Sequence, residues 1–275
     1  MRNTLWGLGG AGFLGGMYVW QWEPFWLEIV RLKMPIRHLP DALVGKSLMQ
    51  ISDIHVGKRF NHQYLIESFN KVRTLNPDLV VYTGDYVSTY RDEVQYRELE
   101  ETFGHLVKGR LGTLAILGNH DYGKNWAQPE VADRIADLLT RHGVEVLRNQ
   151  SSEIAGLNIV GFDDVWAGRL DAARALAHFE PNRAHLVLCH NPDVCDQDVW
   201  GSYNSWILAG HTHGGQVKPP FLPPPLLPVK NRNYTSGLFA LSGGRTLYIN
   251  RALGHLWQVR LNVRPEITLF ELERA

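Results

Sequence analysis

Five short apolar runs in this chain of 275 residues each end in polar side chains able to bind metals or transfer protons. Runs of this length are typical of buried strands. In α/β sheets, the loops that follow the strands converge on one crevice, so these polar ends are expected to meet there. The runs are SLMQISDIH, PDLVVYTGDYV, TLAILGNHD, AHLVLCHNPD and SWILAGHTH, which begin at Ser47, Pro77, Thr113, Ala184 and Ser205.

The segments between these runs predict a mixed α/β domain. Residues 62–75 carry apolar side chains at helical spacing, and further helices are expected over residues 92–107 and 128–142. Strands dominate after that, in VEVLRN, LNIVGFDD, RTLYIN and EITLFEL, with one more helix over residues 171–179. Strand–helix alternation followed by many strands favours one domain of layered sheets with helices outside.

The charge balance excludes one class of function. Lys and Arg total 28, as do Asp and Glu, so the formal net charge is zero. Proteins that bind nucleic acid mainly through its phosphates are usually basic, so no nucleic-acid partner is expected. Two cysteines, Cys189 and Cys195, are too few for a disulfide scaffold.

The N-terminal segment differs from the rest of the chain. Residues 3–21 contain no charged side chain, and the aromatic stretch WQWEPFW follows from Trp20. Apolar length and interfacial aromatics favour an anchor or signal-like segment over residues 1–26, bound to a membrane surface. The alternative is a glycine-rich arm packed on the domain. We expect a linker over residues 27–46 and the main domain over residues 47–275.

A proline-rich stretch, VKPPFLPPPLLPVK, spans residues 217–230. Proline continues neither a helix nor a central strand, so this stretch is predicted to be a surface loop with polyproline character. We expect a semi-rigid apolar lip beside the GHTHGG turn, and the sequence leaves the role of this lip open.

The GHTH turn places His211 and His213 one residue apart. In an extended segment, residues i and i+2 point the same way, so both imidazoles can reach one metal ion. The competing interpretation is a polar turn after a buried strand, with both histidines in solvent.

The other strand ends favour the metal site. Buried polar groups without partners cost about 1–3 kcal/mol each, and a bound metal centre removes that cost. Oxygen and nitrogen ligands without thiolate suit zinc, manganese, iron, nickel or cobalt. So many candidates indicate two divalent ions about 3.5–4 Å apart, a centre suited to phosphoester hydrolysis. Asp85 is the natural bridge because a carboxylate has lone pairs for both ions. The candidates are Asp53, His55, Asp85, Asn119, His120, Asp121, His190, His211 and His213.

The ordered blocks DIH, GD, GNHD, H and GHTH resemble the calcineurin-like metallophosphoesterase superfamily over residues 48–272. The resemblance implies an α/β fold, a four-layer double β-sandwich flanked by helices, and a dinuclear centre. GHTHGGQ, DDVWAG and RPEITLFEL are similar to a branch with YaeI- and YkuE-type phosphodiesterases and a UDP-2,3-diacylglucosamine hydrolase.

This resemblance also implies a role for each candidate. Asp85 would bridge the two ions, and no other cofactor is implied. His120 would protonate the leaving oxygen or stabilise the phosphoryl group, with Asp121 orienting its ring; the alternative for His120 is a solvent-facing turn residue. The first ion would be bound by Asp53, His55 and His213, and the second by Asn119, His190 and His211.

These observations favour a two-metal phosphodiesterase or pyrophosphatase. The leading hypothesis is a membrane-associated bacterial enzyme whose phosphoester substrate is lipid-linked, such as UDP-2,3-diacylglucosamine, which would place it in lipid A biosynthesis. The sequence leaves the membrane face open. One alternative is a phosphodiesterase on a soluble substrate. Another is a metal-stabilised scaffold that binds a partner protein through the proline-rich loop.

Overall fold

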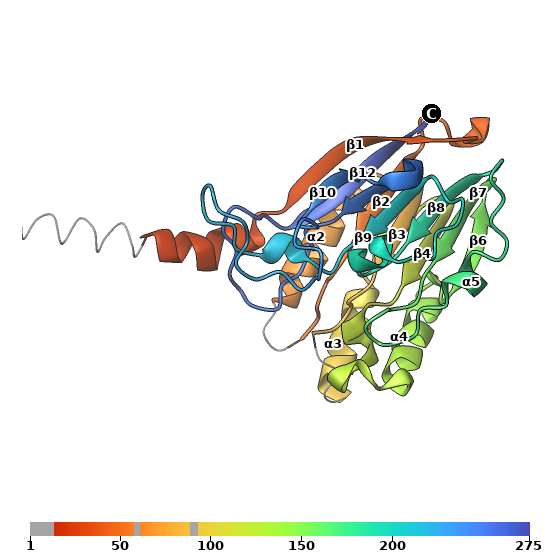
Figure 1. The fold of residues 1–275 in the computed structure, drawn as a ribbon. Helices are drawn as coiled ribbons and strands as arrows, with labels where there is room; N and C mark the ends of the chain where they lie inside the picture. The colour runs from red at the N-terminus through yellow and green to blue at the C-terminus, as the bar shows by residue number, and fades with distance from the viewer. Residues whose placement is uncertain (1–13, 58–60, 89–92) are drawn as a thin grey trace, which may run out of the picture.

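Two six-stranded sheets stacked between helices form the core of the protein (Figure 1). The computed structural model describes residues 14–57, 61–88 and 93–275. In sheet order, the first sheet consists of β1 (Glu28–Ile36), β12 (Glu266–Arg274), β2 (Ser47–Ile51), β3 (Leu79–Thr83), β4 (Gly112–Ile116) and β5 (Glu145–Val146). The second consists of β10 (Gly237–Ala240), β11 (Thr246–Ile249), β9 (Trp206–Ala209), β8 (Ala184–Leu188), β7 (Leu157–Gly161) and β6 (Gln150–Ile154).

The centre of each sheet is parallel. Strands β2 to β5 run parallel in the first sheet, and β7, β8, β9 and β11 do so in the second. Antiparallel pairing joins β12 to β2 and places β6 and β10 at the edges of the second sheet. The carboxyl ends of the parallel strands therefore share one edge of each sheet, where the predicted site residues follow them.

Alternation along the strands builds the layers. In β3, Leu79 and Val81 belong to the apolar cluster between the two sheets, whereas Val80 and Tyr82 belong to the cluster under the helices. This follows because successive strand side chains point to opposite faces. Helices α2 (His62–Arg73), α3 (Glu93–Phe103) and α4 (Pro129–Arg141) cover the first sheet, and the short α5 (Ala172–Ala175) packs on the second. The predicted α/β fold of sandwiched sheets is confirmed.

Three strands were not predicted, and α5 is shorter than expected. β6 and β10 are half-buried edge strands with weak apolar patterns. β1 lies within the segment interpreted as a linker and pairs in parallel with β12. β1 lies at the edge of the first sheet, where Pro35 is tolerated because one row of N–H groups has no partner strand. The expected domain boundaries stay predictions.

The N-terminal segment packs against the C-terminal part of the domain. Residues 14–17 are helical, followed by the helical turns η1 (Tyr18–Trp22) and η2 (Glu23–Phe25). The side chain of Glu23 is buried and accepts a hydrogen bond from the amide of Val263 at 2.7 Å. Residues 1–13 of the predicted anchor lie outside the described residues. Within the described part, no helix combines the length and apolar content needed to cross a bilayer.

Candidate metal centre and active site

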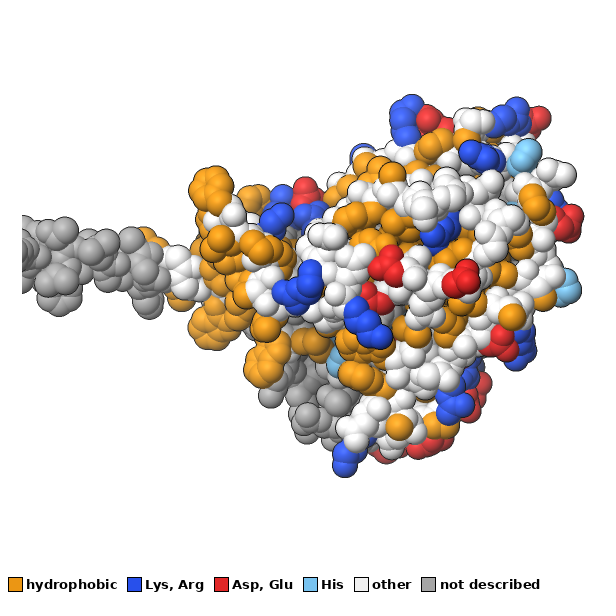
Figure 2. All heavy atoms as spheres, in the orientation of Figure 1, with side chains coloured by type: hydrophobic (Ala, Val, Ile, Leu, Met, Phe, Trp, Pro, Cys, Tyr) orange, Lys and Arg blue, Asp and Glu red, His pale blue; other side chains and the backbone are white. Residues whose placement is uncertain are grey.

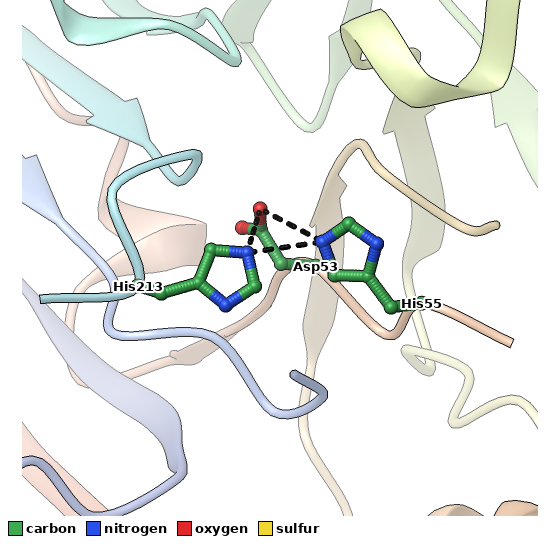
Figure 3. Close-up of side chains that lie close together, drawn as sticks. All are labelled: Asp53, His55 and His213. Atoms are coloured by element: carbon green, nitrogen blue, oxygen red, sulfur yellow. Dashed lines mark hydrogen bonds and ion pairs between the residues drawn. The ribbon is translucent and has the colours of Figure 1, made fainter. Parts of the chain in front are cut away.

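Three side chains from two strand ends converge on one point (Figure 3). Asp53 and His55 follow β2, and His213 lies in the turn after β9. Nε2 of His213 lies 3.0 Å from Nε2 of His55 and 3.3 Å from Oδ1 of Asp53. All three residues are buried. Two imidazole nitrogens and a carboxylate oxygen facing one another form a donor set that suits a divalent cation.

A second group lies directly beside the first. Nε2 of His190 lies 3.2 Å from Oδ2 of Asp85 and 3.2 Å from Nδ1 of His211. The same Asp85 oxygen lies 3.6 Å from Nε2 of His55 in the first group. The structure thus brings six of the predicted ligands into two adjoining groups, and Asp85 is the carboxylate that faces both.

Backbone carbonyls orient two of these imidazoles. Nδ1 of His190 lies 2.7 Å from the carbonyl oxygen of Thr83, and Nε2 of His211 lies 2.7 Å from that of Pro228. A carbonyl oxygen only accepts, so each of these ring nitrogens carries the proton. The lone pair of the other nitrogen then points into the centre, as in metal-binding histidines.

Asn119, the seventh predicted ligand, is fully buried at the wall of the same cavity. Neither its Oδ1 nor its Nδ2 has a hydrogen-bond partner among the described residues. An unsatisfied buried amide costs about 1–3 kcal/mol. A cation bound by its oxygen would remove part of that cost, so Asn119 fits the predicted ligand set.

Two groups of the centre, Asp53 and His211, take the charge state that binds a cation. Burial opposes ionisation of Asp53, but the facing imidazoles of His213 and His190 outweigh it and lower the pKa of this carboxyl group. Burial, reinforced by His190, lowers the pKa of His211 to about 3. Ionised carboxylates and neutral imidazoles are the forms that bind metals.

Strained backbone holds most of the ligands in place. A positive φ is uncommon outside glycine and costs about 1–3 kcal/mol, so it persists where the surrounding structure imposes it. Such strain is concentrated at functional sites. The ligand candidates with positive φ are Asp53 (52°), His55 (50°), Asp85 (58°), His211 (69°) and His213 (51°).

Gly210 allows the two sheets to approach at this point. A Cβ atom on Gly210 would overlap the Ser52 hydroxyl and the Asp53 carboxylate. The GHTH turn can therefore reach the end of β2 only with glycine at this position.

His120 lies half-buried in the wall of the cavity. Its Nδ1 lies 2.7 Å from the carbonyl oxygen of Ser88, and its ring lies 5.1 Å from that of His55. Because Nδ1 carries the proton shared with Ser88, Nε2 is the nitrogen available to a substrate.

The contacts of Asp121 in the structure are with backbone amides, and its expected role in orienting His120 stays a prediction. Its carboxylate accepts hydrogen bonds from the backbone amides of Asp85, Tyr86 and Gly118 at 2.7–2.9 Å. The 3₁₀ turn η4 (Asn119–Tyr122) directs this side chain back toward the end of β3. Asp121 therefore positions the Asp85 backbone, and the Ser88 carbonyl orients the His120 ring.

Four of the candidate ligands line a cavity of about 710 Å³ with largely apolar walls. The polar floor includes Asp85, His211 and His213, and Asn119 and His120 also line the cavity. The walls come from the proline-rich loop and the segment after β11, and they include Val217, Pro225, Leu226, Leu227, Pro228, Leu256, Trp257 and Val259.

Comparison with known proteins agrees with this geometry. The sequence profile of the calcineurin-like phosphoesterases matches residues 46–215. The chain belongs to the calcineurin-like phosphoesterase family. It is 31% identical to phosphodiesterase YaeI of Escherichia coli over 93% of this chain and 92% of YaeI. It is 29% identical to the uncharacterized metallophosphoesterase YkuE of Bacillus subtilis over 96% of this chain and 91% of YkuE. It is 28% identical to the UDP-2,3-diacylglucosamine pyrophosphatase LpxG of Chlamydia trachomatis over 91% of this chain and 92% of LpxG.

This calcineurin-like protein is therefore a metal-dependent phosphoester hydrolase. The family and the two buried Asp/His groups indicate a dinuclear divalent metal centre.

Two groups near the ligands of this calcineurin-like site were not predicted from the sequence. The ring of Trp166 packs edge-on at 4.5 Å against that of His211. Burial raises the pKa of Asp164 to about 6, and its Oδ2 has no hydrogen-bond partner among the described residues. Both lie in DDVWAG, which was noted for its resemblance alone. Its position after the strand LNIVG was the signal that could have found them.

Proposed function

We propose that this enzyme hydrolyses a phosphodiester or pyrophosphate bond in a lipid-linked substrate at a membrane surface. The observation that carries the proposal is the cavity itself, in which a metal-ligand floor meets apolar walls. A phosphoryl group on the floor would place an attached apolar chain against Leu226, Leu227 and Trp257. LpxG, a relative over most of the chain, is described as a pyrophosphatase of UDP-2,3-diacylglucosamine, a substrate with this combination of groups.

Two bound divalent cations would supply a water of lowered pKa and offset the charge on the phosphoryl oxygens. The protein's own groups would do the rest. Asp53, His55 and His213 would hold one ion, and Asn119, His190 and His211 the other, with Asp85 between them. The ligands leave manganese, zinc, iron, nickel and cobalt as candidates.

His120 would complete the reaction from the wall of the cavity. With both ring nitrogens protonated, His120 would donate its Nε2 proton to the leaving oxygen as the bond from phosphorus to that oxygen breaks and the bond to a hydroxide oxygen forms. The ring then keeps its Nδ1 proton on the Ser88 carbonyl and regains the Nε2 proton from water. The Ser88 carbonyl fixes the ring orientation for this step through Nδ1. A positioned imidazole of this kind contributes about 10²–10⁴-fold to the rate.

The N-terminal segment supports the membrane part of the proposal. Trp20 and Trp22 are 53% and 70% exposed although their backbone is packed on the domain. Tryptophan suits the interface between headgroups and acyl chains. Attachment there would bring the cavity close to a lipid-linked substrate.

The test compares the turnover of two substrates by the metal-loaded protein. Turnover of UDP-2,3-diacylglucosamine in detergent micelles is measured beside that of bis-p-nitrophenyl phosphate, with Asp85→Asn as the inactive control. Cleavage of both by the wild type, lost in the variant, supports the proposal. If the enzyme cleaved bis-p-nitrophenyl phosphate and soluble nucleotide diesters but not UDP-2,3-diacylglucosamine, the result would favour a soluble substrate and reject the lipid-linked one.

A further inference from the structure

Exposed apolar side chains gather on one end of the molecule. Sixteen large apolar side chains are exposed in the described part of the chain, and eleven of them lie within residues 14–26, 221–226 and 257–259. Figure 2 shows hydrophobic side chains, in orange, crowded at the left end of the described part of the chain. The eleven are Leu14, Met17, Tyr18, Trp20, Trp22, Trp26, Phe221, Leu222, Leu226, Trp257 and Val259. We call this set the apolar face.

Backbone hydrogen bonds join these three segments into one surface. The amide of Arg260 donates to the carbonyl of Val19 at 3.0 Å, which ties the N-terminal segment to the loop after β11. The amide of Lys218 donates to the carbonyl of Leu261 at 2.8 Å, which ties the proline-rich loop to the same segment. The apolar face is therefore assembled by the fold from segments far apart in the sequence.

The tip of the proline-rich loop is held outward. The side chain of Phe221 is fully exposed, and that of Leu222 is 60% exposed. The guanidinium of Arg232 donates to the carbonyls of Leu227, Pro224 and Pro225, which fixes the base of the loop. A tip built from prolines loses little conformational entropy on docking, because its φ angles are already restricted.

The part of the chain that carries the proline-rich loop and the segment after β11 is basic. Residues 199–265 contain seven lysines and arginines and no aspartate or glutamate. Among them, Lys218, Lys230, Arg232 and Arg264 flank the apolar face, and the structure shows no ion pair for these four with any described residue. An apolar tip with a cationic fringe is complementary to an anionic lipid surface.

We propose that the proline-rich loop is a second membrane contact, separate from the N-terminal segment, and that it docks on an anionic lipid bilayer. Phe221 and Leu222 enter the region between headgroups and acyl chains, while Lys218 and Lys230 meet the lipid phosphates. Lysine is depleted in protein–protein interfaces, so the fringe favours a bilayer over a protein partner. Docking of the loop does not depend on the proposed function. Its consequence, that a lipid-linked substrate passes from the bilayer directly into the cavity, rests on that function.

The consequence follows from the shared residues. Leu226, Trp257 and Val259 belong both to the apolar face and to the cavity wall. Docking by this face would turn the mouth of the cavity toward the bilayer. An apolar chain could then move from the membrane to the wall without crossing water.

The experiment measures vesicle binding by the full chain without substrate. Co-sedimentation is compared on vesicles of phosphatidylcholine mixed with phosphatidylglycerol and on vesicles of phosphatidylcholine alone. Phe221→Ser/Leu222→Ser should weaken partition to the mixed vesicles about tenfold or more. The matched control, Val44→Ser/Leu111→Ser, changes two apolar residues that are 46% and 45% exposed outside the apolar face, and it should bind like the wild type. Turnover of bis-p-nitrophenyl phosphate should be unchanged in both variants, which shows that they are folded.

A second variant tests the charge. Lys218→Gln/Lys230→Gln should lose about fivefold in binding per lysine on the mixed vesicles and little on phosphatidylcholine alone. Wild-type binding by the Phe221→Ser/Leu222→Ser variant would overturn the proposal. So would a dimer in size-exclusion chromatography that this variant dissociates, because the face would then bind a second copy. Since no substrate is present, failure of lipid-linked turnover would reject the proposed function and leave this inference standing.

Discussion

Nε2 of His211 lies 2.7 Å from the carbonyl oxygen of Pro228, so the proline-rich loop takes part in holding a candidate metal ligand. The same loop supplies the wall of the cavity through Leu226 and Leu227. Its position therefore affects both the second ligand group and the space for a substrate.

Loosening the base of this loop should weaken the second metal site. Arg232→Met removes three hydrogen bonds to the carbonyls of Leu227, Pro224 and Pro225. With Pro228 less well placed, affinity for the second ion should fall about tenfold or more, as it does when other outer-shell partners are lost. Titration with Mn²⁺ and metal analysis should show one site weakened and the other intact. Arg97→Met, on an exposed part of α3, is the matched control; equal loss at both sites would contradict the prediction.

Removing the proposed general acid should matter most when the leaving group is poor. His120→Ala is expected to lower kcat by about 10²–10⁴-fold for an alkyl phosphodiester and by much less for bis-p-nitrophenyl phosphate, whose leaving group needs little protonation. Metal content should not change. His178→Ala alters an exposed histidine as a control. Equal losses on the two substrates would argue against proton donation by His120.

A methyl group at the contact between the sheets should disrupt the first ligand group. In Gly210→Ala, the new Cβ would overlap Ser52 and the Asp53 carboxylate, so Asp53 or the GHTH turn must move. We expect loss of bound metal and a destabilisation of about 1–3 kcal/mol, as for other overpacked sites. Thermal unfolding and metal analysis measure both effects. Gly16→Ala, where a Cβ would meet nothing within 4 Å, should leave both unchanged.

His255 should make the protein less stable in acid. Burial, aided by the charge of Arg260, lowers the pKa of His255 to about 3. Below the unfolded-state pKa of about 6.5, the unfolded chain binds a proton that the folded protein does not, so stability falls as the pH drops. Between pH 7 and pH 5, this residue should cost about 2 kcal/mol of unfolding free energy.

The measurement for His255 is urea unfolding at several pH values. His255→Gln should lose less stability than the wild type between pH 7 and pH 5, by about that amount. His178→Gln, at an exposed position, should follow the wild-type curve. Parallel curves for the wild type and His255→Gln would show that His255 is not the group responsible.

The sequence determined the α/β fold and indicated which residues gather at the strand ends. Apolar runs and helical spacing are local patterns, and they predicted β2, β3, β4 and the helices that cover them. The order of polar residues after these runs indicated six ligands that the structure places in two adjoining groups. The weakly patterned edge strands β6 and β10, and β1 with its proline, did not show the same signal.

Only the tertiary structure decided how the side chains of the centre are held. The carbonyls of Thr83, Ser88 and Pro228 orient three imidazoles, and every residue type has such a carbonyl, so no sequence pattern marks them. Positive φ at the ligands, the backbone bonds of Asp121 and the apolar face also depend on which segments become neighbours. Hydrophobic patterning acts along the chain and can be seen in the sequence, whereas these contacts exist only after distant backbones have packed together.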